Sequence, residues 1–129
     1  MYPQGNCCNR GCNPVETFNI NAHFIAPNPS TSFNRKSVSP SLDSTVYVGP
    51  FSSIIGDVTI QKNVFIAPNV SIRTDEGTPF FIDSDTNIQD GVILHGLEGR
   101  RVLNNNKLYS IYIGKSATCG HGCIIHGAC

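Results

Sequence analysis

The stretch LDSTVYVGPFSSIIGDVTIQKNVFIAPNVSI, residues 42–72, decides the fold. Apolar residues recur in it at every sixth position, and a second apolar series runs two positions ahead of the first. This period is neither that of an α-helix nor that of a single alternating strand. A six-residue repeat with two inward positions is typical of a parallel β-helix. The first series is Leu42, Val48, Ile54, Ile60, Ile66 and Ile72, and the second is Val46, Val58, Val64 and Val70, with Ser52 in the gap.

The repeat is interrupted twice and resumes after each interruption. The first interruption is TDEGTP, residues 74–79, and the second is the polar segment 96–110. We expect both to be loops on one continuous coil, in which three hexapeptides make one turn. The resumed first series is Ile82, Ile88 and Leu94, then Ile113, Cys119 and Ile125, and its companion series holds Ile111, Ala117, Cys123 and Cys129. The three C-terminal cysteines are therefore expected to be small core residues.

Composition supports an all-β fold and excludes several classes of partner. The 129 residues fit one domain, and only 14% of them are charged, with a net charge of zero. A core without Trp must come from Val, Ile and Phe, which favour strands. We expect no binding to nucleic acid or to a membrane, because the chain carries neither a basic excess nor a long apolar run. The N-terminus lacks the layout of a signal peptide, so a cytoplasmic location is expected.

The domain boundary is predicted at residue 38. Residues 1–37 are rich in Asn, Pro and Ser and have no apolar period, so we expect a flexible extension before a β-helix domain of residues 38–129. Cys7, Cys8 and Cys12 lie in this extension. They could bind a soft metal, or they could be incidental thiols of a disordered tail.

Counting repeat positions predicts which side chains meet. Residues three hexapeptides apart lie on the same side of the coil, so Ile72, Leu94 and Ile125 share one side. The residues that follow them, Arg73, His95 and His126, then share one column. Neighbouring coils lie about 4.8 Å apart. Two imidazoles at that spacing can hold one metal ion.

The same counting places His121 in a different column, together with Asp90. Gln89 directly precedes Asp90. His121 could therefore join His95 and His126 only if a neighbouring subunit contributed it. Three such subunits would form a closed ring with three sites.

Three motifs carry a resemblance to a known family. RTDEG at 73–77, NIQDGVILH at 87–95 and HGCIIHG at 121–127 resemble the γ-class carbonic anhydrases, including the carbonic-anhydrase-like domain of carboxysomal scaffold proteins. The resemblance covers roughly residues 42–129 and implies that the coil is left-handed. Family members continue with further coils and a C-terminal helix. We expect that helix to be lacking here, since the sequence stops at Cys129.

The resemblance also implies roles for individual residues. The metal ligands would be His95, His121 and His126, with His121 coming from the adjacent subunit of a homotrimer. Zn²⁺ is the expected metal, and Fe²⁺ or Co²⁺ could use the same ligands. Gln89 would orient a metal-bound hydroxide, while Glu76 and Glu98 would handle protons. The remaining matched residues would be structural: Arg73 and Asp75 as an intersubunit ion pair, with Asp90 nearby.

The implied activity is the reversible hydration of CO₂ to bicarbonate by metal-bound hydroxide at the trimer interfaces, since the metal lowers the pKa of bound water to about 7. One departure from the founding type is a short basic loop, with Arg100, Arg101 and Lys107 against Glu98. It favours an alternative, a scaffold or binding module that keeps the metal but has little activity.

A hexapeptide acyltransferase, which typically relies on a single catalytic His, is a weaker alternative. The last is a single-chain zinc site formed by Cys119, His121, Cys123 and His126.

Overall fold

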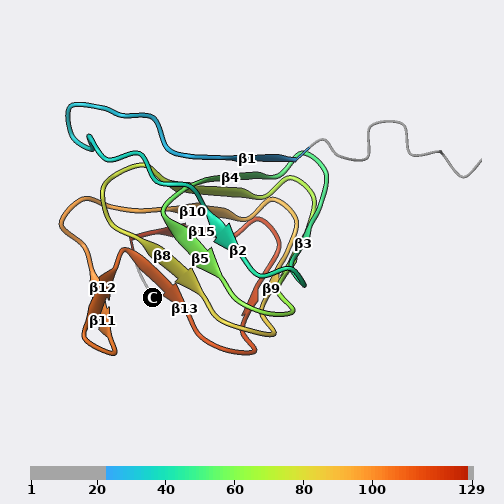
Figure 1. Ribbon diagram of the computed structural model, residues 1–129. Coiled ribbons are helices and arrows are strands. Elements are labelled where there is room, and N and C mark those ends of the chain that lie inside the picture. Colours follow the sequence, from blue (N-terminus) through green and yellow to red (C-terminus); the bar gives the residue numbers. More distant parts are fainter. Residues whose placement is uncertain (1–22, 128–129) are drawn as a thin grey trace, which may run out of the picture.

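Three parallel sheets form the three sides of a coil (Figure 1). The computed structural model describes residues 23–127, and all regular structure in that range is β-strand. Sheet A holds β1 (Phe24–Ala26), β4 (Ser53–Gly56), β7 (Ser71–Thr74), β10 (Ile93–His95) and β15 (Ile124–His126). Sheet B holds β2 (Ser41–Leu42), β5 (Val58–Ile60), β8 (Phe80–Ile82) and β13 (Ile111–Ile113). Sheet C holds β3 (Tyr47–Val48), β6 (Phe65–Ile66), β9 (Asn87–Ile88) and β14 (Thr118–Cys119).

From β2 onward the chain visits sheets B, C and A in turn. Each hexapeptide is thus one side of the coil, and it stacks on the hexapeptide three repeats before it. This arrangement confirms the predicted left-handed parallel β-helix of hexapeptide repeats. Within residues 23–127 there is no helix that is long and apolar enough to cross a membrane.

The two apolar series form the core. Every residue predicted to face inward between Leu42 and Ile125 is either buried or packed against the buried cluster. Ser52, which breaks the second series, is also buried. Its hydroxyl donates to the carbonyl of Ala67 at 2.7 Å and accepts from the amide of Val70 at 3.1 Å. The polar residue is tolerated because both of its hydrogen-bonding functions are satisfied.

Both interruptions leave the register of the coil intact, as predicted. Ile82 of β8 pairs with Ile60 of β5 before it and with Ile113 of β13 after it. Ile72, Leu94 and Ile125 stack on sheet A in the same way. The first interruption is a turn between β7 and β8, and the second carries a hairpin.

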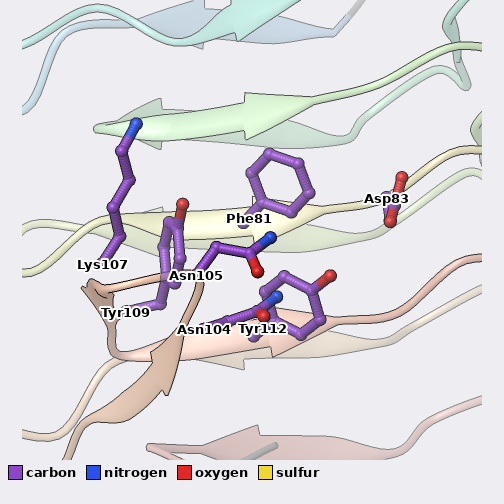
Figure 2. A pocket seen from close by; sticks show the side chains of 7 residues that line it. All are labelled: Phe81, Asp83, Asn104, Asn105, Lys107, Tyr109 and Tyr112. Atoms are coloured by element: carbon purple, nitrogen blue, oxygen red, sulfur yellow. The ribbon is translucent and has the colours of Figure 1, made fainter.

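The hairpin is formed by β11 (Val102–Asn104) and β12 (Lys107–Tyr109), and it projects from the edge of sheet B (Figure 1). Tyr109 packs against Phe81 and Tyr112, whose rings stack at 5.4 Å between centroids. Figure 2 shows these three rings. They line part of a recess of about 250 Å³. The aromatic contacts attach the hairpin to the outer face of the sheet.

The N-terminal part differs from the predicted flexible extension. Phe24, Ile25 and Ala26 of β1 pair in parallel with β4, so sheet A already begins before residue 38. Asn28 then organises the following loop through hydrogen bonds to Lys36 and Val38. Sequence reasoning missed this because the bonds come from the backbone and from amide side chains, which have no apolar period. Cys7, Cys8, Cys12 and Cys129 lie outside the described residues.

Candidate metal centre

The predicted column of Arg73, His95 and His126 is present. Parallel pairing sets His95 of β10 opposite Arg73 on one side and opposite His126 on the other. The rings of His95 and His126 stack with their centroids 5.1 Å apart and their planes 27° apart. Because Leu94 and Ile125 point into the core, the next residue in each strand must point outward. The core register therefore fixes the histidine pair at the surface.

Three charged side chains surround the Nε2 atom of His95. The Nη2 atom of Arg73 lies 3.0 Å away, Oδ1 of Asp75 lies 3.2 Å away, and Oε1 of Glu76 lies 3.4 Å away. In a neutral imidazole, Nε2 can either donate to a carboxylate or accept from the guanidinium, but it cannot do both. Nε2 is thus the focus of a small polar network in which donors and acceptors compete.

The turn between β7 and β8 supplies the two carboxylates. It adds four residues to the ordinary six-residue spacing, since Ile72 and Ile82 are ten positions apart. Asp75 also accepts from Arg73, with Oδ2 3.3 Å from Nε. This contact lies within one chain. The intersubunit ion pair that the family resemblance implied stays a prediction. The pair closes locally because the two residues flank the end of β7.

His121 lies at a separate corner, between β14 and β15. Its Nδ1 atom is 3.3 Å from Oδ1 of Asp90, and both side chains are exposed. The amide of Gly122 donates to the carbonyl of Asp90 at 2.9 Å, which fixes the two corners in one column. The predicted second column is therefore present. Within one chain it does not meet the His95–His126 pair.

The donor chemistry around His95 fits a divalent metal ion. One ligand atom from each of Asp75, Glu76 and His95 lies within 4.8 Å of the others, and the three side chains are half-buried. His126 adds a second imidazole next to His95. Imidazole nitrogens and carboxylate oxygens are the ligands that zinc uses in catalytic sites. One chain thus offers part of a coordination shell.

The single-chain cysteine and histidine site is not formed by the described residues. Cys119 is buried, and Cys123 packs against the core. Burial, with a smaller effect of the neighbouring Cys123, raises the pKa of the Cys119 thiol to about 11. Both thiols face the core, and the described residues bring neither of them into a group of metal-ligating atoms. His121 and His126 point away from it, toward solvent.

Gln89 and Glu98 are near the column residues in sequence, but within residues 23–127 their side chains form no hydrogen bond or ion pair with them. The backbone amide of Gln89 donates to the carbonyl of Cys119 at 3.0 Å, which holds the backbone beside Asp90. Glu98 is exposed in the segment that leaves β10 toward the hairpin. Their catalytic roles stay predictions.

Sequence reasoning missed one residue next to the site. Asn34 lies in the loop before β2, and its side chain reaches the backbone of Asp75. Nothing in the local sequence PNPSTSFN indicates a long-range contact. Such a residue can be found only from the folded chain.

Comparison with known proteins gives a consistent result. The chain is 53% identical over 100 residues to the carboxysome assembly protein CcmM of Nostoc sp., and 41% identical over 113 residues to a carbonic anhydrase of Methanosarcina thermophila. These matches cover 77% and 80% of this chain. A solved hexapeptide transferase family protein from Anaplasma phagocytophilum matches with a TM-score of 0.57 and 36% identity, over 70% of this chain and 46% of that chain. No family model matches the sequence.

The hexapeptide coil, the histidine column and these matches together define the class of the protein. The chain belongs to the γ-class carbonic anhydrase family, and it is similar both to a carbonic anhydrase and to CcmM proteins. It spans 18% of the Nostoc relative and 46% of the Methanosarcina relative. What those longer proteins do is therefore carried to this chain only as a proposal.

Proposed function

We propose that this chain forms a homotrimer that hydrates CO₂ reversibly to bicarbonate at metal sites between its subunits. His95 and His126 of one subunit would hold the metal together with His121 of the partner subunit. The observation that carries the proposal is the stacked His95–His126 pair, with two carboxylates at Nε2 of His95. Zn²⁺ is the proposed ion, and it would supply Lewis-acid activation of water near neutral pH.

The residues around the histidines have distinct proposed tasks. Asp75, 3.2 Å from Nε2 of His95, would place a carboxylate beside the metal at that ring. Glu76, 3.4 Å from the same atom, would hold a proton released at the site. Gln89 would orient the reacting oxygen, since an amide hydrogen-bonds without titrating. Glu98, exposed beyond β10, would pass the proton to buffer.

The trimer is proposed because of the separation between the two columns. His121 pairs with Asp90 at a corner of its own, so a third imidazole for His95 and His126 must come from another copy. A head-to-tail contact that closes after three copies gives every subunit the same role. Fe²⁺ or Co²⁺ would fit the same donors, because imidazole binds all three ions. The cytoplasmic location stays a prediction.

A second candidate is a metal-binding module with little activity, used as part of a scaffold. It is favoured by the 53% identity to a protein named for carboxysome assembly, and by the basic residues Arg100 and Arg101 near Glu98. An acyltransferase, suggested by the match to a solved hexapeptide transferase family protein, is less well supported. The two stacked imidazoles with adjacent carboxylates are more than a single catalytic His requires.

Stopped-flow measurement of CO₂ hydration on zinc-loaded protein separates these candidates, provided that metal content is measured on the same sample. Hydration that falls with metal content on treatment with a chelator supports the enzyme. Stoichiometric zinc without hydration above the buffer rate supports the scaffold module. A protein that takes up no zinc at the histidines contradicts both.

A further inference from the structure

The loop between β1 and β2 is held closed by a buried asparagine. The Oδ1 atom of Asn28 accepts from the amide of Val38 at 2.9 Å, and its Nδ2 donates to the carbonyl of Lys36 at 2.8 Å. The hydroxyl of Ser37 donates to the carbonyl of Asn28 at 2.7 Å. These bonds join the two ends of the loop, so the residues between them form a compact unit rather than a free linker.

Asn34 lies at the far end of this loop and faces the turn that carries Asp75 and Glu76. Its backbone amide donates to the hydroxyl of Thr31 at 3.0 Å, and its backbone carbonyl accepts from the amide of Thr31 at 2.8 Å. Its Nδ2 atom donates to the carbonyl of Asp75 at 3.3 Å. With the side-chain amide rotated by half a turn, its oxygen instead accepts from the amide of Gly77 at 3.3 Å and gains a bond from Asn28. The second orientation satisfies more groups, and both tie Asn34 to the same turn.

The turn has few other attachments. At its start, the Thr74 hydroxyl donates to the carbonyl of Ile55 at 3.2 Å. At its end, Thr78 accepts from the hydroxyl of Ser110. Between these anchors, within residues 23–127, the backbone of 75–77 is hydrogen-bonded only through Asn34. The position of this short backbone segment decides where the Asp75 and Glu76 carboxylates lie relative to His95.

We infer that Asn34 is a positioning residue for the metal centre. By holding the turn, it keeps the two carboxylates against Nε2 of His95, and so it increases the affinity of the histidine site for a divalent metal. Asn34 touches neither the metal nor His95 itself. The inference rests on the proposed function, because it assumes that His95 is a ligand.

The test measures binding of Co²⁺ by the full chain, through the absorption bands of the bound ion. Asn34→Ala is expected to weaken the affinity roughly tenfold, at the lower end of the range for groups that orient metal ligands. Ser32→Ala, an exposed change in the same loop, is the control and should bind as the wild type does. Far-UV circular dichroism and the melting temperature of each variant show whether the coil itself is intact.

A double-mutant cycle separates positioning from a general loss of structure. With Asp75→Asn and Glu76→Gln already present, Asn34→Ala should have no further effect on Co²⁺ affinity. An equal loss in both backgrounds, or wild-type affinity of Asn34→Ala in the native background, overturns the inference. His95→Ala distinguishes a failure of this inference alone from a failure of the proposed metal centre. If it binds Co²⁺ as well as the wild type does, the proposed metal centre fails and this inference fails with it.

Discussion

The imidazoles of His95 and His126 stack at 5.1 Å although the residues are 31 positions apart in the chain. Their spacing is set by backbone hydrogen bonding between β10 and β15, which pairs the two residues directly. Neither ring has to be ordered by the other. A pair of ligands preset in this way loses little side-chain freedom when an ion binds.

Replacing His95 by Ala should remove bound metal without unfolding the coil. The side chain lies on the outward face of sheet A and contributes nothing to the buried cluster. His23→Ala is the matched control, since His23 precedes β1 and is remote in sequence from the column. Metal content by elemental analysis and the melting temperature are measured for both variants. Full retention of metal by His95→Ala would contradict the three-histidine site.

Mixing two variants that each lack one ligand tests whether His121 comes from the partner subunit. Pure His121→Ala and pure His126→Ala trimers should both be poor in metal. After joint unfolding and refolding, an interface regains all three ligands only when the His121→Ala chain supplies His95 and His126 and the His126→Ala chain supplies His121. Random order in a cyclic trimer gives this at about a quarter of interfaces. Metal content should recover to roughly that fraction, whereas no recovery in assembled trimers contradicts the shared site.

Gln89→Ala should lower CO₂ hydration while metal content stays unchanged. The amide would act on the reacting oxygen and not on the metal, so only catalysis depends on it. The loss is expected to be at least roughly tenfold, as for other groups that orient a reacting atom. Gln61→Ala provides a control on the neighbouring sheet corner after β5. An active wild type with an equally active Gln89→Ala variant would remove Gln89 from the mechanism.

Cys119→Ser should destabilise the protein by about 1–3 kcal/mol, because it places a hydroxyl in the apolar interior of the coil. Cys119 is buried among the inward residues of sheet C. Thr118→Ser on the same strand faces outward and should change the free energy of unfolding very little. Urea denaturation of both variants measures the difference. Equal stability would mean that Cys119 does not face the core.

Phe51→Asn should stabilise the protein by roughly 1 kcal/mol, because Phe51 has a left-handed conformation that is costly for a bulky side chain. Its φ is 61°. Asn69, Gly91 and Gly122 occupy the same corner in the next coils, also with positive φ. Phe51 is 66% exposed, so little buried area is lost. Phe33→Asn, an exposed change without positive φ, is the control, and an equal or greater gain there would contradict the explanation.

The coil could be predicted from the sequence because its period is strict. Once Ile72, Leu94 and Ile125 are assigned to one inward column, the residues after them must form an outward column, and the structure has both. The side-chain contacts around His95 could not be predicted from the repeat. Which atoms of Asp75 and Glu76 approach His95 depends on the backbone of an irregular turn, to which the repeat does not apply.

The N-terminal loop shows the second reason for incomplete prediction. Asn28 and Asn34 hold their surroundings through individual hydrogen bonds, and asparagine is equally common in loops that hold nothing. The pairing of β1 with β4 was hidden as well, because a three-residue strand is too short to display a period. Local polar contacts of this kind leave no signature that spacing can reveal.

The excursion that carries the β11–β12 hairpin leaves and rejoins the coil at nearly the same point. A methyl group added to Gly96 would lie 3.1 Å from the Ser110 hydroxyl and 3.3 Å from Phe80. The first and last residues of the excursion are therefore in close contact. The length of the intervening chain is therefore decoupled from the stacking of the strands, and lengthening it costs only a slowly growing closure entropy. Asn105 and Asn106 at the hairpin tip are therefore a suitable position for inserting a foreign peptide or attaching a fluorophore.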